Sequence, residues 1–178
     1  MRGFFAIGAE RISKPRNLGA LMRTGHAFGA SFVFSINAAR DIKAAHSADT
    51  SKSDGQIPFY QWDSIDEMQL PRGCQLVGIE LTDDAVMLPT FRHPPQAAYI
   101  LGPEKGNLSP EILERCAHVV KIPTKFCINV SLAGALVMYD RHLLMGSHAP
   151  RPIMPGGPDG PRRKHVPGPD RRKPGSGA

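Results

Sequence analysis

Short apolar runs alternate with helix-like patterns along the first 149 residues. The runs GFFAIGAE at 3–10 and SFVFSI at 31–36 are compact and apolar, which predicts buried strands. Between them, NLGALMRTGHAFG at 17–29 places its large apolar side chains at helical spacing. This alternation predicts an α/β domain with a mostly parallel sheet flanked by helices on both faces. Further strands are predicted at 75–81, 97–102 and 118–122, and further helices at 109–117 and 130–145.

The predicted helix at 130–145 is apolar around most of its circumference. Its large apolar side chains together spread round most of the helix, and small residues between them allow close approach: Val130, Leu132, Leu136, Val137, Tyr139, Leu143 and Leu144. A helix of this kind must be buried on several sides, either under other elements or against a second chain. We expect a homodimer that forms through this helix.

Composition changes after residue 146. Residues 147–178 are dominated by Pro, Gly, Lys and Arg, and apolar periodicity is lost. Such a segment buries too little surface to offset its ordering entropy, so we predict one folded domain at 1–146 and a disordered basic tail at 147–178. From residue 150 onward, seven Lys and Arg against two Asp give 7 − 2 = +5 of the total +6. Two interpretations stay open: an arm that binds phosphate backbones, or a solvated tail that keeps the protein soluble.

Length and composition are typical of a soluble, single-domain protein. The chain has 178 residues, of which 41% are hydrophobic and 21% charged. The sequence lacks the roughly 18 uninterrupted apolar residues of a membrane span, and its start lacks a signal-peptide cleavage pattern. The three cysteines are far apart without a CxxC pair, which argues against disulfides and a zinc site. We therefore expect a cytoplasmic protein that binds no membrane and no metal.

Three loops are the candidates for a functional site. The sequence has neither GxxxxGK[ST] nor GxGxxG, so P-loop and Rossmann-type nucleotide binding are not supported. The loops at 14–31, 101–110 and 122–131 follow predicted strands or open predicted helices. Ligands of parallel α/β sheets collect at the carboxyl ends of the strands, where these loops would meet.

Each polar residue in these loops also has a structural interpretation. Asn17 and Asn129 are typical helix N-caps, and Arg23 is typical of a solvated helix face. Glu104 could hold its loop together by accepting backbone N–H bonds, and Cys127 could be a small buried hydrophobe. Only the order of the three loops along the chain favours a functional role.

Taken in that order, the loops resemble the three motifs of the SpoU/TrmH branch of the SPOUT superfamily, a branch of RNA ribose 2′-O-methyltransferases. The first motif, N-x-G-x-x-x-R-T-x-x-x-F-G, is similar to NLGALMRTGHAFG at 17–29. The second, G-x-E-x-x-G-L-S, is similar to GPEKGNLS at 102–109. The third, I-P followed by S-L-N-V-S and an alanine-rich helix, is similar to IP…CINVSLAGA at 122–135.

This resemblance implies a fold, a cofactor and partners. Members of the branch form a trefoil knot in the C-terminal part of their α/β domain, a feature that periodicity would not predict because knots are nearly absent from proteins. They bind S-adenosylmethionine in the knot and work as homodimers through the last helix. Since no extra RNA-binding domain precedes the first strand, the resemblance favours tRNA over rRNA as the substrate.

The resemblance also implies roles for individual residues. Arg23 matches the arginine placed at the target ribose, and Asn17 matches the asparagine that supports it. Glu104 matches the acid of the second loop, and Asn129 the asparagine beside the reaction centre. Cys127 stands where a serine helps to bind the RNA phosphate. The expected cofactor contacts come from Gly102, Ile122 and Ile128, with Ile79 or its neighbour Glu80 as a further candidate.

The sequence departs from the motifs at two positions. Asn107 replaces a glycine, and asparagine tolerates a left-handed backbone, so we expect the turn to persist. Cys127 replaces the serine, and a thiol is a larger and weaker hydrogen-bond donor, so the contact with RNA is left open.

Two other functions are compatible with the sequence. Cys127 could be a covalent nucleophile, with His118 or His142 as its general base. The chain could also be a non-catalytic RNA-binding module that retains the fold. In a methyltransferase, Arg23 would stabilise charge rather than act as a base, because the pKa of arginine lies above about 12.

Overall fold

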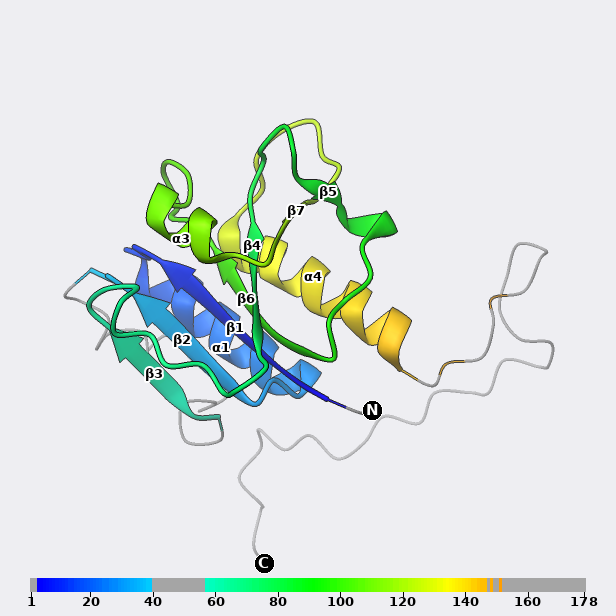
Figure 1. Cartoon of the computed structure of the whole chain (residues 1–178), viewed down its shortest axis with the longest axis horizontal. Coiled ribbons are helices and arrows are strands. Elements are labelled where there is room, and N and C mark those ends of the chain that lie inside the picture. The colour runs from blue at the N-terminus through cyan, green and yellow to red at the C-terminus, as the bar shows by residue number, and fades with distance from the viewer. Residues whose placement is uncertain (1–2, 40–56, 147, 149–150, 152–178) are drawn as a thin grey trace, which may run out of the picture. The chain divides into compact units, whose positions relative to one another are not determined.

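A computed structural model describes residues 3–39, 57–146, 148 and 151, and in it one parallel sheet carries the fold. The strands lie in the order β3-β2-β1-β6-β4-β7-β5, and each neighbouring pair is parallel (Figure 1). The predicted parallel α/β architecture is therefore confirmed. The strands are β1 Phe4–Glu10, β2 Phe32–Ile36, β3 Phe59–Trp62, β4 Gln75–Ile79, β5 Val86–Met87, β6 Gln96–Leu101 and β7 His118–Lys121; the helices are α1 Pro15–Phe28, the 3-10 turn η3 Leu88–Thr90, α3 Pro110–Arg115 and α4 Val130–Met145.

The strand order reverses between β1 and β6. From β1 the chain builds outward through β2 and β3 on one side, whereas β4 to β7 all lie on the other side of β1, in the order β6, β4, β7, β5. In an open parallel sheet, the crevice at such a reversal is the usual ligand site, at the carboxyl ends of the strands. The topology therefore places a site where the loops that follow β1 and β6 meet.

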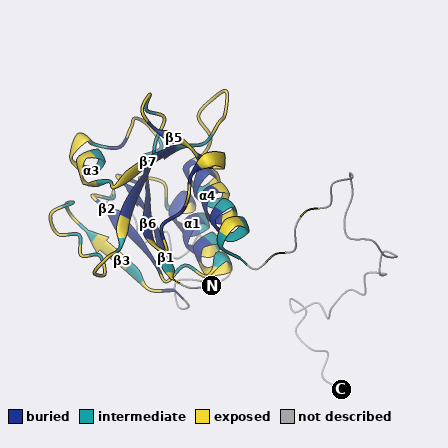
Figure 2. Ribbon diagram, turned by 45° about the vertical axis from the view of Figure 1, so that its right-hand side comes forward, coloured by how far each residue is buried: buried dark blue, intermediate teal, exposed yellow. Residues whose placement is uncertain are grey.

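Helices cover the two faces of the sheet unequally. α1 and α4 lie together on one face, where Leu21, Leu101 and Val137 belong to one buried cluster (Figure 2). Gly134 of α4 lies so close to α1 that a Cβ there would come 2.6 Å from the side chain of Leu21. The other face is covered by α3 and the segment 62–74, over a core that contains Phe34, Ile100 and Ile112.

The main predicted elements are present, and the differences have physical reasons. β3 and β5 were not predicted because they are short edge strands with exposed or half-exposed side chains, and η3 because it is only three residues long. α1 begins at Pro15, a favoured first helical position. Asn17 thus lies inside the first turn of α1, and its N-cap interpretation is wrong.

Parts of the predictions fall outside the described residues. The polar stretch predicted at 37–56 is described only at its first three residues, and the predicted tail only at His148 and Arg151. Within the described ranges, none of the helices is both long enough and apolar enough to cross a membrane.

A buried arginine fastens α4 to the sheet. Arg141 is 1% exposed, and its guanidinium donates to the carbonyl oxygens of Pro94 at 2.7 Å, Pro95 at 2.9 Å and Phe4 at 3.3 Å. It also donates to the hydroxyl of Tyr99 at 3.1 Å. These bonds join the end of α4 to the start of β1 and the turn before β6.

A histidine extends this buried cluster to a neighbouring acid. His93 Nδ1 lies 2.6 Å from the Tyr99 hydroxyl, and His93 Nε2 lies 2.9 Å from Asp140 Oδ2. Burial lowers the pKa of His93, and Arg141 lowers it further against the opposing effect of Asp140. The neutral ring therefore accepts from Tyr99 and donates to Asp140, a tautomer that satisfies each partner.

Candidate active site at the carboxyl ends of the strands

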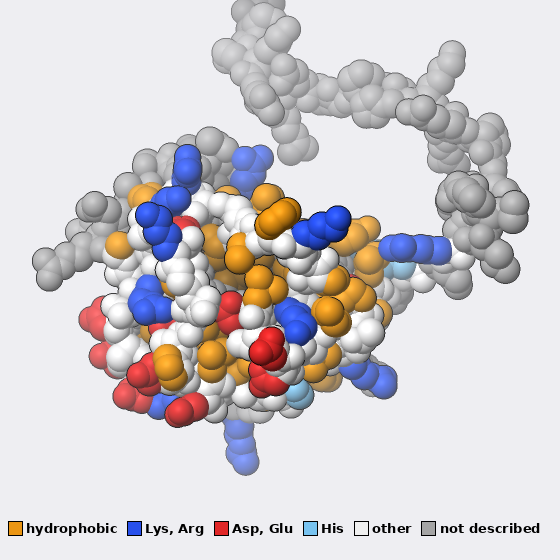
Figure 3. Space-filling view, turned by 90° about the horizontal axis from the view of Figure 1, so that it is seen from above, with side chains coloured by type: hydrophobic (Ala, Val, Ile, Leu, Met, Phe, Trp, Pro, Cys, Tyr) orange, Lys and Arg blue, Asp and Glu red, His pale blue; other side chains and the backbone are white. Residues whose placement is uncertain are grey.

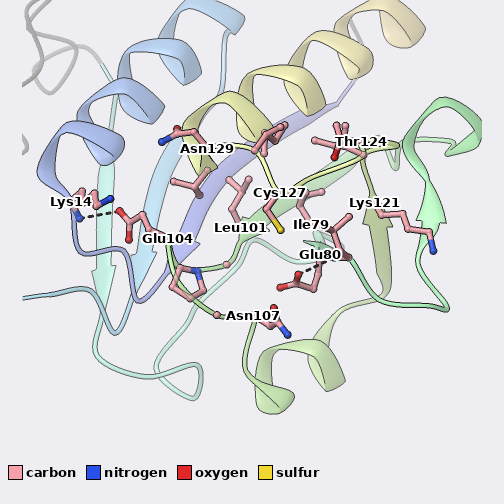
Figure 4. A pocket seen from close by; sticks show the side chains of 18 residues that line it. Lys14, Ile79, Glu80, Leu101, Glu104, Asn107, Lys121, Thr124, Cys127 and Asn129 are labelled. Carbon is pink, nitrogen blue, oxygen red and sulfur yellow. Dashed lines mark hydrogen bonds between the residues drawn. The ribbon is translucent and has the colours of Figure 1, made fainter.

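A cavity of about 370 Å³ opens where the strands end, and the three predicted loops form its walls (Figure 4). Its size lies within the range of small-molecule sites. Figure 3 looks down on this edge of the sheet, where hydrophobic side chains are exposed near the middle, with both basic and acidic side chains around them and the acidic ones gathered at the lower left. Of the residues predicted to bind or act here, the cavity is lined by Ile79, Gly102, Glu104, Ile122, Cys127, Ile128 and Asn129.

Glu104 ties the second loop to the first. Its carboxylate accepts four hydrogen bonds, from Ser13 N, Ser13 Oγ, Lys14 N and Asn17 Nδ2, each at 3.0 Å. Burial alone would raise the pKa of Glu104, but the hydrogen bonds from Asn17, Ser13 and Lys14 outweigh it and the net pKa is lowered. Glu104 is therefore an anion whose lone pairs are used to hold two loops in register.

Asn17 and Asn129 continue this chain of hydrogen bonds to the third loop. Asn129 Nδ2 donates to Asn17 Oδ1 at 3.2 Å. Asn129 Oδ1 accepts from Ser131 N at 2.9 Å and from Ser131 Oγ at 2.6 Å, which makes Asn129 the N-cap of α4. The predicted capping role is confirmed, and the same side chain also reaches the first loop. One network thus joins all three loops.

Charged side chains hold the other end of the second loop. Glu80 Oε2 accepts from Leu108 N at 2.7 Å, and Glu10 Oε2 accepts from Ser109 N at 2.8 Å. Glu80 follows β4 directly and Glu10 ends β1, so both are fixed by the central strands. A loop bonded at both ends gives the cavity a preformed wall.

The turn in this loop differs from the one predicted. Gly106 has a φ of 96°, whereas the non-glycine residues with positive φ in the described part of the chain are Arg11 and Asn37. Asn107 therefore does not use the left-handed conformation that asparagine tolerates. Gly106 supplies that conformation one residue earlier, and the carbonyl of Asn107 accepts a 2.6 Å bond from Arg11.

Neither of the two histidines expected as a general base, His118 and His142, is placed to serve Cys127. Cys127 is exposed at the cavity. His118 begins β7, at the end of the strand away from the cavity, and pairs with Gln75 at 3.1 Å. His142 comes 13 residues after Asn129, about 20 Å along α4 at 1.5 Å per residue. These positions argue against a thiol enzyme, and no group of His, Cys, Asp or Glu in the described residues could hold a metal.

Two predicted residues do not line the cavity: Asn17, which is joined to it through Glu104 and Asn129, and Arg23. Arg23 lies on the exposed side of α1. Arg16 precedes it by seven residues, about two helical turns, so both arginines share one exposed face of α1.

Several lining residues were not singled out from the sequence. Lys14, Lys121 and Thr124 line the cavity, and Lys121 Nζ donates to Thr82 O at 3.0 Å. The sequence shows that these residues lie near the ends of strands. That position alone does not distinguish a lysine that lines the cavity from one that points into solvent. Glu10 and Arg11 were not predicted as site residues either, because both precede the first motif.

The chain matches the sequence model of the SpoU rRNA Methylase family over residues 5–139. The chain belongs to this family. The motif resemblance is thereby confirmed, and the loops that carry it are the loops that form the cavity.

Two tRNA methyltransferases are similar in sequence to most of this chain. It is 29% identical over 154 residues to the mouse tRNA (guanosine(18)-2'-O)-methyltransferase TARBP1, covering 81% of this chain and 10% of that protein. It is 27% identical over 137 residues to the Escherichia coli K12 tRNA (guanosine(18)-2'-O)-methyltransferase, covering 74% and 59%. The chain thus spans less than two thirds of the length of these relatives.

Solved structures of SpoU-type proteins have the same fold. The AdoMet-bound rRNA methyltransferase from Sinorhizobium meliloti superposes with a TM-score of 0.73 at 21% identity, covering 83% of this chain and 59% of that one. The SpoU methyltransferase AviRb from Streptomyces viridochromogenes, in complex with AdoMet, gives 0.72 at 21% identity, covering 84% and 60%.

Proposed function

We propose that the protein is an S-adenosylmethionine-dependent RNA methyltransferase that methylates a ribose 2′-hydroxyl, in tRNA rather than rRNA. The observation that carries this proposal is the network Glu104–Asn17–Asn129, which draws the three family loops around one cavity. The names of the two tRNA methyltransferases similar to this chain support the choice of tRNA. We also propose that the protein acts in the cytoplasm.

The lining of the cavity fits S-adenosylmethionine. Ile79, Leu101 and Ile128 offer apolar walls to an adenine ring, and the carboxylate of Glu80 suits a ligand with a cationic sulfonium. At Gly102 a Cβ would come within 3.3 Å of Glu80 Oε2 and of Leu108 N, so a side chain there would crowd this wall. Gly102, Ile79, Ile122 and Ile128 are the residues that would hold the cofactor.

The side chains around the cavity have positioning roles in the proposed reaction. S-adenosylmethionine, when bound, supplies an electrophilic methyl group. Asn17 and Asn129 orient the loops at the cavity, and alignment of reactants alone contributes several kcal/mol. Since Glu104 already accepts four hydrogen bonds, we assign it to holding the loops rather than to proton transfer.

The test of this function is methyl transfer by the full chain. The protein is incubated with S-adenosylmethionine carrying a tritiated methyl group and with total tRNA, or rRNA, from cells in which the gene is deleted. We expect label in tRNA that resists alkaline cleavage next to the modified ribose. Label on a base, or none with measurable cofactor binding, would contradict the proposal. Absence of cofactor binding in a titration would instead favour a non-catalytic RNA-binding module.

Arg23 is proposed to hold an RNA phosphate and stabilise the developing alkoxide. Its exposed position on α1 suits a contact with the RNA backbone. We expect Arg23→Lys to lower kcat/KM by about 10- to 100-fold, because lysine lacks the planar fork of donors that pairs with phosphate. Binding of the cofactor should stay unchanged. Near-full turnover by the lysine variant with normal RNA affinity would contradict this role.

Cys127 is proposed to contact RNA in the place of a serine. We expect Cys127→Ser to retain kcat within about threefold, because a hydroxyl at the same position is the better donor. Cys127→Ala, the matched variant without a donor, should raise KM for tRNA. Complete loss of activity in Cys127→Ser would point to a covalent thiol instead.

We propose that the C-terminal part of the domain forms a trefoil knot. Family membership supports this, as does the position of the second and third loops around one cavity directly before α4. A crystallographic trace of the chain through both loops would test it. The match over residues 5–139 also supports a methyltransferase domain at 1–146, with the basic residues 147–178 as a separate segment.

We propose that the chain is a homodimer through α4. Leu132, Leu136 and Tyr139 are 60%, 43% and 48% exposed and recur at the i, i+4, i+7 spacing of one helix face. Figure 2 shows this outward side of α4 as exposed and half-exposed residues. Contiguous apolar surface of this kind marks an interaction site, and a second copy would bury it.

The dimer proposal predicts the effect of one charge on this face. Leu136→Glu is expected to convert the dimer to a monomer, measured by sedimentation velocity at micromolar concentration, because an unpaired carboxylate is costly to bury. Val86→Glu is the matched control, since Val86 is also 43% exposed but lies on β5. Dimerisation of Leu136→Glu as tight as that of Val86→Glu would exclude α4 as the interface.

A further inference from the structure

Phe126 is the most exposed large hydrophobic residue in the described part of the chain. It is 82% exposed and belongs to neither of the two hydrophobic clusters. It also takes part in none of the ring contacts found among the described residues. Single exposed apolar side chains are common on protein surfaces, so the surroundings of Phe126 decide whether it has a function.

Phe126 stands at the mouth of the cavity. It lies in the third loop between Thr124 and Cys127, which both line the cavity, whereas Phe126 itself does not (Figure 4). Adjacent Cα atoms are about 3.8 Å apart, so the ring is held close to the lining residues. A ring in this position can contact a substrate that enters the cavity and leaves the space inside free for a cofactor.

The loops that form the cavity are basic. Residues 14–31, 101–110 and 122–131 contain five Lys or Arg and a single acid, Glu104. The carboxylate of Glu104 is already used in hydrogen bonds between the loops. The five basic residues are all exposed: Lys14, Arg16, Arg23, Lys105 and Lys125. The mouth of the cavity therefore suits an anionic partner such as a phosphate backbone.

We infer that Phe126 stacks on an unpaired base of the RNA at the mouth of the cavity, while Lys125 beside it contacts a backbone phosphate. Proteins hold single-stranded RNA with exposed aromatic rings next to basic side chains, because every base offers a flat face for stacking. Such stacking tolerates any base, so Phe126 positions the nucleotide and does not select it. The identification of the partner as RNA rests on the proposed function.

Phe126→Leu removes the aromatic face but keeps a large apolar side chain. We expect this variant to raise KM for tRNA about 10-fold and to leave kcat within about threefold, because stacking on a base stabilises the bound substrate and the transition state alike. Phe126→Trp keeps an aromatic face and should keep KM within about threefold. A normal KM in Phe126→Leu, or an equal rise in Phe126→Trp, would overturn the inference.

Tyr60→Leu is the matched control. Tyr60 is 49% exposed on β3 and does not line the cavity, and its ring stacks on Trp62 with the centroids 6.0 Å apart. Its replacement should leave KM for tRNA within about twofold. An equal rise of KM in Tyr60→Leu would show that any exposed aromatic ring has this effect, and would overturn the inference.

Two measurements on Phe126→Leu distinguish RNA from other partners of the ring. We expect its sedimentation velocity and its affinity for S-adenosylmethionine to match those of the unmodified protein. A weakened dimer would assign the ring to a subunit interface, and a weakened affinity for the cofactor would assign it to the cofactor site. Either result would overturn the inference.

The fluorescence of Phe126→Trp separates the inference from the proposed function. The natural chain has one tryptophan, Trp62 on β3, so a titration of the unmodified protein with tRNA gives the background. We expect tRNA to quench the introduced indole beyond that background. Quenching without methyl transfer by the unmodified protein would contradict the proposed function alone. Methyl transfer without the additional quenching would overturn the inference alone.

Discussion

Replacing Arg141 by methionine is expected to lower the free energy of unfolding by about 3 kcal/mol. The buried guanidinium donates to three backbone carbonyls and to the hydroxyl of Tyr99. Methionine fills similar space but donates nothing, so the carbonyl of Pro94 in particular is left buried without its partner. Urea denaturation at a fixed protein concentration measures the change.

Arg92→Met is the matched control for this prediction. Arg92 lies in the same turn before β6 but is exposed, so its replacement should change stability by no more than about 0.5 kcal/mol. Equal destabilisation by the two variants would mean that the buried hydrogen bonds do not fasten α4.

Glu104→Ala is expected to lower kcat/KM by about 100-fold or more. The carboxylate joins the second loop to Ser13, Lys14 and Asn17, and Asn17 in turn joins Asn129. Without it the three loops lose their common register at the cavity, and small misplacements of reacting groups are costly in rate. The affinity for S-adenosylmethionine should fall as well, measured by calorimetry beside the tritium assay.

Two further variants sharpen this prediction. Glu104→Gln should also lose activity, because its amide nitrogen would face a donor where the carboxylate accepts. Glu114→Gln, an exposed acid outside the cavity, should retain the normal rate. Normal kinetics in Glu104→Ala would show that the loops keep their positions without the network.

The sequence predicted those strands and helices whose buried side chains form a continuous apolar run or recur at helical spacing. β1, β2, β4 and β6 are apolar runs between helices, and α4 is apolar on the side that packs on α1. The site loops could be predicted for the same reason, since strand ends in a parallel sheet meet at one edge.

The parts that escaped prediction depend on contacts between distant residues. His93 and Asp140 are 47 positions apart, and Arg141 bonds Phe4 across 137 positions, so no local pattern marks the cluster. Glu10 looks like the polar end of a strand until the backbone of Ser109 is placed beside it. Gly106 rather than Asn107 makes the left-handed turn, and the motif alone does not show which of the two neighbouring residues takes it.

The bond between Asn17 and Asn129 also bears on the order of folding. It closes a loop of 112 residues, and contacts of such separation form late because the intervening chain must first be ordered. A ribosome adds about 5–20 residues per second, so Asn129 is synthesised roughly 6 to 20 seconds after Asn17. During that interval the face of α1 that later packs on α4 is exposed. We therefore expect newly made chains to expose this apolar face until the three loops meet.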